Sequence, residues 1–170
     1  SGYKAPKSFF TNIDYDKELD EFLYKTVGYD INKERVNSLL KKNDIKNEIN
    51  KKDLKLQNNS IITKNNNFLK NFNFFIVTVP TPLIKNKLPD LKFLRDSIKT
   101  ISKFLKKGDF IVIESTVYPG TTKLLAKKIL EKNSNLKLNK DFFIGYSPER
   151  INPGDKKHQV QNIKKVLAFE

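Results

Sequence analysis

The strongest constraint on the fold is a set of three short apolar runs with helix-length segments between them. The runs are NFFIVTV at 73–79, DFIVIES at 109–115 and DFFIGYS at 141–147. Continuous β-branched and aromatic residues are typical of strands buried on both faces, as in a parallel sheet. Parallel neighbours need a long crossover, usually a helix, and both intervening segments are long enough for one.

The segment between the first two runs repeats apolar residues at spacings of three and four: Leu91, Leu94, Ile98, Ile101 and Leu105. This spacing predicts an amphipathic helix. We expect the helix to begin at Pro89 and to stop before Gly108. A second helix should follow the next run, with Thr121 or Thr122 as its cap.

An earlier β/α unit precedes these runs. KTVGYD at 25–30 predicts a strand that ends in an acidic residue, and Asn32 is a suitable cap for a helix reaching about residue 42. SIIT at 60–63 predicts one more short strand, whereas residues 43–60 are polar. The alternation of strand and helix predicts an α/β fold with a doubly wound, mostly parallel sheet. Residues 1–24 show no clear period and remain an unassigned N-terminal segment.

Composition excludes several classes of protein. The chain has no Cys, which removes disulfides, thiolate metal sites and a cysteine nucleophile from these 170 residues. No stretch of about 18 apolar residues is present, so we expect no membrane span, and no metal site is predicted. No signal peptide is evident either, which predicts a cytoplasmic protein.

The net charge of +14 suggests a nucleic-acid partner at first sight. However, 30 of the 33 basic residues are Lys and they are dispersed, whereas base and phosphate readers favour Arg. Lys, Asn and Ile are all abundant, as expected when codons are rich in A and T. We therefore expect no nucleic-acid partner.

Four unusual segments follow the four longer predicted strands. They are Asp30, PTP at 80–82, STVYPG at 115–120 and SPERINPGD at 147–155. Proline and glycine end strands for conformational reasons alone, which explains each segment singly. Because ligands of parallel α/β sheets bind outside the carboxyl ends of the strands, the four together favour a ligand-binding edge.

Several side chains at this edge have both a binding and a structural interpretation. Asp30 can accept hydrogen bonds from an adenosine ribose, or it can cap the following helix. Thr78 and Thr81 bracket Pro80, in a turn that holds backbone groups near a ligand or simply ends the strand. The structural alternative stays open for each of them.

Two further segments of this edge carry polar side chains. Ser115 and Thr116 offer hydroxyls where free N–H groups favour anions, or they cap a helix. Glu149 and Arg150 form a charged pair between prolines, which suits a ligand loop or a surface salt bridge. The single histidine, His158, is interpreted as a surface residue.

The motifs together resemble the N-terminal half of the nucleotide-sugar 6-dehydrogenases, the UDP-glucose/GDP-mannose dehydrogenase family. The resemblance rests on five ordered segments: GYDINKERV (28–36), VTVPTP (77–82), PDL (89–91), ESTVYPGTT (114–122) and GYSPERINPGD (145–155). The branch that acts on UDP-N-acetyl-hexosamines is the most similar. The resemblance implies that 25–170 form an incomplete, Rossmann-like NAD-binding domain.

Roles for individual residues follow from the resemblance. It implies NAD as cofactor, with Asp30 on the adenosine ribose, Arg35 nearby, and Val79, Pro80 and Thr81 under the dinucleotide. Ser115 and Thr116 would lie near the nicotinamide, with Thr116 assisting catalysis through a water. Glu149 would approach the nicotinamide and the reacting sugar carbon, and Arg150 and Asn152 would meet the UDP-sugar. The implied activity is oxidation of C6 of a UDP-N-acetyl-hexosamine to the uronic acid, for surface polysaccharide synthesis.

The sequence departs from the family pattern in two places. The family has a first strand and a glycine-rich turn about 20 residues before the acidic residue, whereas here residues 1–12 contain only Gly2. The family's cysteine nucleophile, which carries covalent intermediates, has no counterpart in these residues. We therefore expect the usual first strand to be missing. The sequence is either part of a longer enzyme, which would be able to form a homo-oligomer, or a truncated, non-catalytic remnant. Such a remnant would keep the fold and at most bind nucleotide or a homologous subunit.

Overall fold

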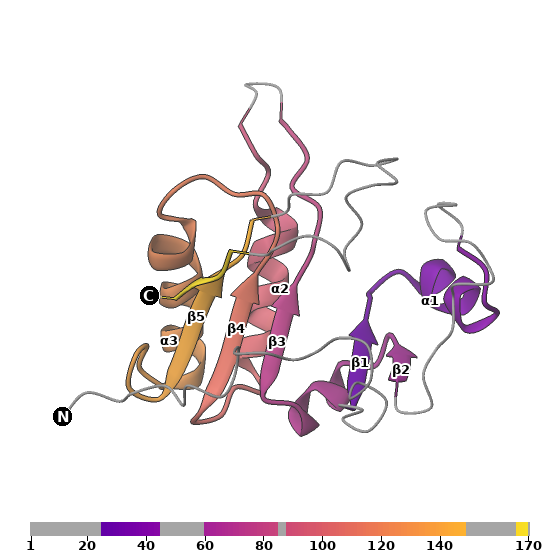
Figure 1. Ribbon diagram of the computed structural model, residues 1–170, viewed down its shortest axis with the longest axis horizontal. Helices are drawn as coiled ribbons and strands as arrows, with labels where there is room; N and C mark the ends of the chain where they lie inside the picture. The colour runs from indigo at the N-terminus through magenta and orange to yellow at the C-terminus, as the bar shows by residue number, and fades with distance from the viewer. Residues whose placement is uncertain (1–24, 45–59, 85–87, 149–165, 170) are drawn as a thin grey trace. The chain divides into compact units, whose positions relative to one another are not determined.

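The computed structural model describes residues 25–44, 60–84, 88–148 and 166–169. The chain divides into two compact units, residues 1–65 and 66–170 (Figure 1). Each unit is described by itself.

The first unit contains two parallel strands and one helix. Strand β1 (Thr26–Tyr29) pairs with β2 (Ser60–Thr63), with Thr26 opposite Ser60, and both predicted strands are confirmed. Helix α1 (Lys33–Leu40) follows β1. The predicted cap is also confirmed, because the side-chain oxygen of Asn32 accepts hydrogen bonds from two N–H groups of the first turn. Val36 is the buried residue of this helix.

The second unit contains a four-stranded sheet in the order β3-β4-β5-β6. Strands β3 (Phe74–Val77), β4 (Asp109–Ile113) and β5 (Phe142–Tyr146) are parallel, as the three apolar runs predicted. A short antiparallel strand, β6 (Ala168–Phe169), completes the edge next to β5. The architecture is the mostly parallel α/β fold expected from the sequence.

Two helical segments cover one face of this sheet (Figure 1). They are α2 (Lys92–Ser102) and the continuous pair formed by the π-helical turn η3 (Thr122–Ala126) and α3 (Lys127–Ser134). A 3-10 helix, η2 (Asn66–Asn71), precedes β3. The core between helices and sheet consists of residues that are at most 7% exposed: Phe75, Val77, Leu94, Ile98, Ile101, Ile111, Ile113, Ala126, Leu130, Phe142 and Ile144.

The opposite face of the sheet carries a row of aromatic rings. Phe110 stacks on Phe143 with ring centroids 4.9 Å apart and lies 6.2 Å from Phe74. The ring of Phe169 meets Phe110 edge-on at 6.0 Å. Phe74 and Ile76 on β3 remain 48% and 56% exposed, so this end of the apolar face is open to solvent.

The structure corrects three local expectations. Helix α2 begins at Lys92 rather than at Pro89, because Pro89 forms an isolated bridge with Leu83 and Asp90 Oδ1 accepts the N–H of Lys92. It ends at Ser102, so Leu105 lies outside it. Thr121 does not cap the following helix with its side chain, because its hydroxyl donates to the carbonyl oxygen of Tyr118 at 2.8 Å.

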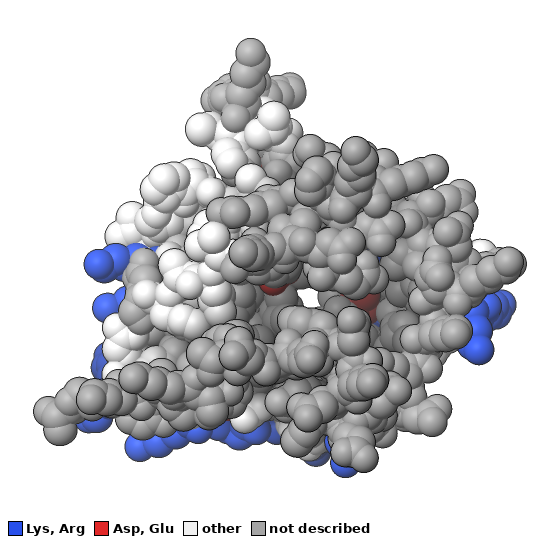
Figure 2. All heavy atoms as spheres, viewed as in Figure 1, with Lys and Arg blue, Asp and Glu red and all other residues white. Residues whose placement is uncertain are grey.

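Figure 2 shows Lys and Arg side chains along the lower edge of the view, where β3, β4 and β5 begin in Figure 1.

None of the helices in the described ranges is both long and apolar enough to span a bilayer. In the same ranges, no three acidic, His or Cys side chains come together as a metal site would require.

Candidate functional site

The loops after β3 and β4 form a pocket of about 240 Å³ at the carboxyl ends of these strands. Its lining consists of Thr78, Val79, Pro80, Thr81, Glu114, Ser115 and Thr116. The structure therefore brings together five residues of the predicted cofactor edge: Val79, Pro80, Thr81, Ser115 and Thr116. We call this cavity the strand-end pocket.

Hydrogen bonds hold the two loops of this pocket against each other. The hydroxyl of Thr81 donates to the carbonyl oxygen of Thr116 at 2.8 Å. The N–H of Glu114 donates to the carbonyl oxygen of Val77 at 2.9 Å, which extends the ladder one residue past the end of β4. Ser115 is 6% exposed, and its hydroxyl donates a longer bond to the same Val77 oxygen at 3.4 Å. These bonds tie the loop after β3 to the loop after β4 along the rim of the pocket.

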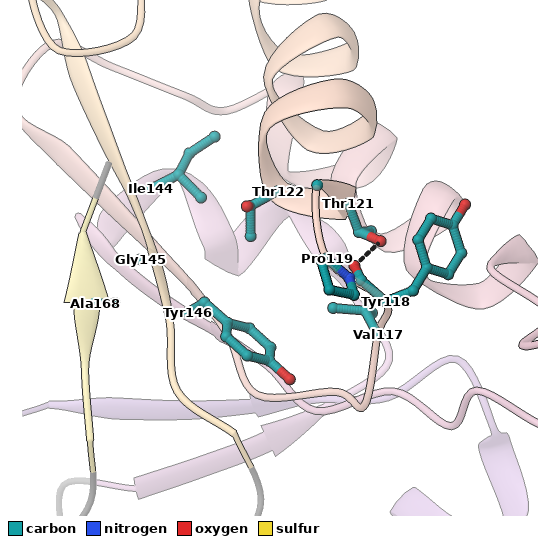
Figure 3. A pocket seen from close by; sticks show the side chains of 10 residues that line it. Val117, Tyr118, Pro119, Thr121, Thr122, Ile144, Gly145, Tyr146 and Ala168 are labelled. Carbon is teal, nitrogen blue, oxygen red and sulfur yellow. Dashed lines mark hydrogen bonds between the residues drawn. The ribbon is translucent and has the colours of Figure 1, made fainter.

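A second cavity of about 340 Å³ lies beside the loop after β4 (Figure 3). Residues 117–122 form one wall, and Ile144, Gly145, Tyr146 and Ala168 form the other. Gly120 has φ +88°, a left-handed conformation that turns the loop into the helix at little conformational cost. We call this cavity the loop pocket.

Asp30 ends β1 in the first unit, and both of its oxygens are engaged. Oδ1 accepts the N–H of Asn32 at 2.8 Å, and Oδ2 lies 3.6 Å from Nε of Arg35. The two side chains are 38% and 31% exposed, so the carboxylate remains accessible to a ligand. Asp30 does not cap the helix, because Asn32 is its N-cap. Its Oδ1 instead holds the turn before the helix, and its ribose role stays a prediction.

The carboxyls with shifted pKa values lie at the other end of the sheet. Burial raises the pKa of Asp109 against the opposing effect of the N–H donated by Lys106. The hydrogen bond from the N–H of Lys137 lowers the pKa of Asp141, against a smaller effect of burial, and the Lys107 ammonium adds to the lowering. Both carboxylates accept a backbone N–H in the turns that enter β4 and β5, so they belong to the scaffold.

The site residues of the last predicted segment lie outside the described residues. They are Glu149, Arg150 and Asn152, and their roles stay predictions.

Ser147, which the motif analysis did not single out, directly follows β5. Its hydroxyl is buried and has no hydrogen-bond partner within the described structure. The sequence offered one signal for it, a polar residue directly after an apolar strand and before Pro148.

The residues present fit a dinucleotide in part. Asp30 supplies an acceptor at a strand end, as the ribose of a dinucleotide requires. The strand-end pocket supplies hydroxyls and backbone groups at the carboxyl edge of the sheet. A glycine-rich phosphate turn is not found among the described residues, whose glycines are Gly28, Gly108, Gly120 and Gly145. The ribose and the strand-end portion of a dinucleotide therefore have matching groups here.

Comparisons with known proteins point to one family. Residues 18–169 match the model of the UDP-glucose/GDP-mannose dehydrogenase family, NAD binding domain. A UDP-N-acetyl-D-glucosamine 6-dehydrogenase of Pseudomonas aeruginosa is 50% identical over 142 residues, which cover 84% of this chain and 34% of that relative. The chain thus spans about a third of the length of the curated relatives it matches.

Solved structures show the same fold. The UDP-D-ManNAc dehydrogenase of Pyrococcus horikoshii superposes with a TM-score of 0.69 at 34% identity, over 77% of this chain and 32% of that one. An NDP-N-acetyl-D-galactosaminuronic acid dehydrogenase from Methanosarcina mazei Go1 gives a TM-score of 0.73 at 25% identity, over 86% and 34%. The fold is therefore Rossmann-like, and the chain belongs to the UDP-glucose/GDP-mannose dehydrogenase family through its NAD binding domain.

Proposed function

We propose that this chain is the cofactor-binding part of an NAD-dependent UDP-N-acetyl-hexosamine 6-dehydrogenase. Such an enzyme oxidises C6 of the sugar to the carboxylate of the uronic acid, in the synthesis of surface polysaccharides. The observation that carries the proposal is the 50% identity with a UDP-N-acetyl-D-glucosamine 6-dehydrogenase over most of this chain. The strand-end pocket supports it, because it lies where α/β sheets bind nucleotides.

We assign the cofactor residues as follows. Asp30 accepts hydrogen bonds from the adenosine ribose, and Arg35 holds the carboxylate in place. Val79, Pro80 and Thr81 support the dinucleotide from the loop after β3. Ser115 lies beside the nicotinamide from the loop after β4. In this proposal residues 25–170 act as one incomplete NAD-binding domain.

Two residues take the catalytic roles in this proposal, Thr116 and Glu149. When bound, NAD accepts a hydride from the sugar carbon. Thr116 orients a water through its hydroxyl, and its carbonyl oxygen is held by Thr81. Glu149 approaches the nicotinamide and the sugar, while Arg150 and Asn152 bind the UDP-sugar with it.

A non-catalytic nucleotide-binding chain is the second candidate. The family chemistry uses a cysteine nucleophile, which these 170 residues do not contain and which the non-catalytic candidate does not need. Both candidates place the protein in the cytoplasm, and neither needs a nucleic-acid partner. The first adds a homo-oligomer formed by a longer protein.

Calorimetric titration with NAD and with UDP-N-acetyl-D-glucosamine tests the proposal. We expect saturable binding of NAD that weakens in Asp30→Asn, and no binding of either compound would refute the proposed function. An immunoblot of source cells separates the two candidates. A band of about twice this mass or more supports the dehydrogenase, and a band at 19.8 kDa supports the non-catalytic chain.

A further inference from the structure

Ser147 carries a polar group that the scaffold does not use. Its side chain is 2% exposed, and its Oγ has no hydrogen-bond partner within the described structure. The backbone of Ser147 continues the pairing of β5 with β4, because its N–H donates to the carbonyl oxygen of Ile113 at 3.0 Å. The backbone thus has a hydrogen-bond partner in the sheet, whereas the side-chain hydroxyl has none in the described structure.

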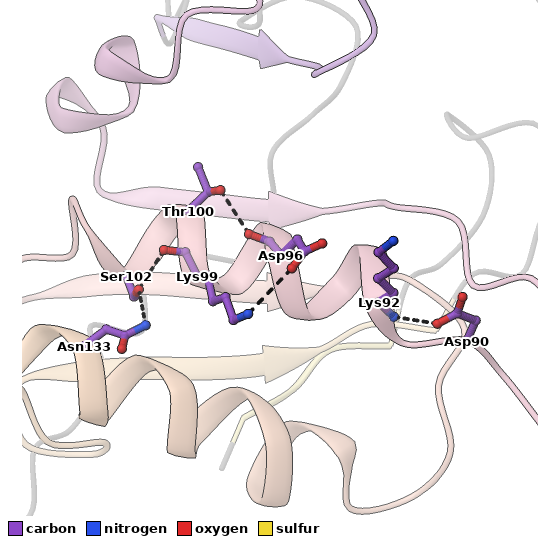
Figure 4. Close-up of polar contacts among 7 residues, drawn as sticks. All are labelled: Asp90, Lys92, Asp96, Lys99, Thr100, Ser102 and Asn133. Atoms are coloured by element: carbon purple, nitrogen blue, oxygen red, sulfur yellow. Dashed lines mark hydrogen bonds and ion pairs between the residues drawn. The ribbon is translucent and has the colours of Figure 1, made fainter.

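A second buried serine shows what a structural role looks like in this fold. Ser102, at the end of α2, is 3% exposed. Its hydroxyl donates to the carbonyl oxygen of Lys99 at 2.8 Å and lies 3.1 Å from the Nδ2 donor of Asn133 on α3 (Figure 4). A hydroxyl that is buried without such partners loses its hydrogen bonds to water and gains none in the protein, which costs free energy of folding. Ser147 therefore needs a different explanation from Ser102.

The sheet register places Ser147 at the carboxyl edge of the sheet, on the level of two residues of the strand-end pocket. Val77, Ile113 and Tyr146 lie opposite one another on β3, β4 and β5. The next residue of each strand is Thr78, Glu114 and Ser147, so these three share one level at the carboxyl edge. Thr78 and Glu114 line the strand-end pocket, and Tyr146 lines the loop pocket. Ser147 lines neither pocket itself, but it directly follows a wall residue of the loop pocket and shares the edge of the strand-end pocket.

We propose that Ser147 is a ligand-binding residue whose hydroxyl exchanges a hydrogen bond with an uncharged polar group of the bound nucleotide. The group is a carboxamide or a sugar hydroxyl, which can both donate and accept as a serine does. This inference rests on the proposed function and deepens it by adding a residue of β5 to the site. A serine hydroxyl moves among three staggered positions, so it can take up a ligand partner without a change of backbone.

The test compares Ser147→Ala with Ser102→Ala, its matched control. The melting temperature is measured without ligand, and the Kd is measured for NAD and for UDP-N-acetyl-D-glucosamine separately. We expect Ser147→Ala to keep or raise the melting temperature and to weaken binding of one ligand about fivefold to tenfold. Ser102→Ala should lower the melting temperature by about 2–4 °C and leave both affinities unchanged.

The two ligands identify the group that Ser147 binds. Weakened binding of NAD alone assigns the carboxamide or ribose of the dinucleotide, and weakened binding of the UDP-sugar alone assigns the substrate. If the wild type binds a ligand and Ser147→Ala binds both as tightly, the inference is wrong and the proposed function stands. A melting temperature that falls as far in Ser147→Ala as in Ser102→Ala also overturns it. A wild type that binds neither compound refutes the proposed function itself.

Discussion

The hydroxyl of Thr81 donates to the backbone carbonyl oxygen of Thr116 at 2.8 Å, and this bond joins the loops that follow β3 and β4. The two residues are 35 positions apart in the sequence. Thr81 thereby fixes the backbone of the residue that we assign to catalysis. The bond therefore joins the two sides of the rim of the strand-end pocket.

Replacing Thr81 with valine should loosen this rim. The change keeps the branched shape and removes the donor, so we expect about 1 kcal/mol lower stability and a several-fold weaker affinity for NAD. Thr100→Val is the control, because the hydroxyl of Thr100 makes a similar bond to the carbonyl oxygen of Asp96 on α2. It should lose similar stability without losing affinity. Equal affinities of wild type and Thr81→Val would show that the rim needs no such tie.

Asp30→Asn should separate the role of Asp30 in the turn before α1 from its role in binding the ribose of NAD. The asparagine oxygen can still accept the N–H of Asn32, so α1 should persist by circular dichroism. Loss of the charge removes the pairing with Arg35 and weakens the acceptor for ribose, and we expect NAD affinity to fall about tenfold or more. Asp90→Asn is the control, since Asp90 accepts the N–H of Lys92 at the same 2.8 Å in the other unit. An unchanged Kd in Asp30→Asn would remove Asp30 from the ribose role.

The sequence predicted the elements whose cause is local. Alternating apolar runs and helical spacing located β3, β4, β5 and α2, and the side chain of Asn32 predicted the start of α1. What it missed depends on partners distant in the chain. Strand β6 has two residues and forms because it pairs with β5, whose partner residues lie 22 and 24 positions earlier. A pattern of two residues is too short to predict such a strand from the sequence. The hydroxyl of Thr121 has two local alternatives, the N–H groups of the following helix and the carbonyl oxygen of Tyr118. In the structure it donates to the carbonyl oxygen of Tyr118 and does not cap the helix.

The candidate site divides in the same way. Proline, threonine and acidic residues after strands pointed to the strand-end pocket, because parallel strands end at one edge. Sequence alone does not show which hydroxyls the fold satisfies. Ser115, Ser102 and Ser147 are all buried serines, yet their hydrogen bonding differs. That distinction required the three-dimensional arrangement.

Asp109→Asn and Asp141→Asn should change stability in opposite directions at neutral pH. Burial raises the pKa of Asp109 above its ordinary 3.8, so its ionised form costs stability at pH 7 and protonation relieves the cost as the pH falls. The N–H of Lys137 lowers the pKa of Asp141, so its contribution is present above pH 3.8 and disappears as the pH falls through the lowered value. We therefore expect Asp109→Asn to melt higher and Asp141→Asn to melt lower than the wild type at pH 7.

The pH series provides the check. As the pH falls from 8 to 3, the melting temperature of each variant should approach that of the wild type. Parallel curves, with a constant offset at every pH, would show that the changes act through packing and not through charge.

Gly145 leaves room for an aromatic ring from β6. A Cβ at this position would lie 2.9 Å from Cε1 and 3.0 Å from Cδ1 of Phe169, which is closer than carbon atoms pack. Gly145→Ala should therefore displace Phe169 and cost about 1–3 kcal/mol, measured by denaturant unfolding. The double variant Gly145→Ala with Phe169→Ala should lose less than the sum of the two single changes. Strict additivity would mean that the two residues do not touch in solution.

Among the described strands β3 pairs with β4 on one side only, and we expect its other side to make the protein associate. Its four residues, FFIV, include no charge and no proline, the features that usually protect edge strands, and Ile76 is 56% exposed. We expect concentration-dependent association by sedimentation velocity, which Ile76→Lys should suppress because a charge at the edge opposes strand pairing. Leu124→Lys is the control, as Leu124 is 62% exposed on η3 and away from the edge. Equal suppression by both variants would attribute association to general hydrophobicity, and a monomeric wild type would show that the edge does not pair.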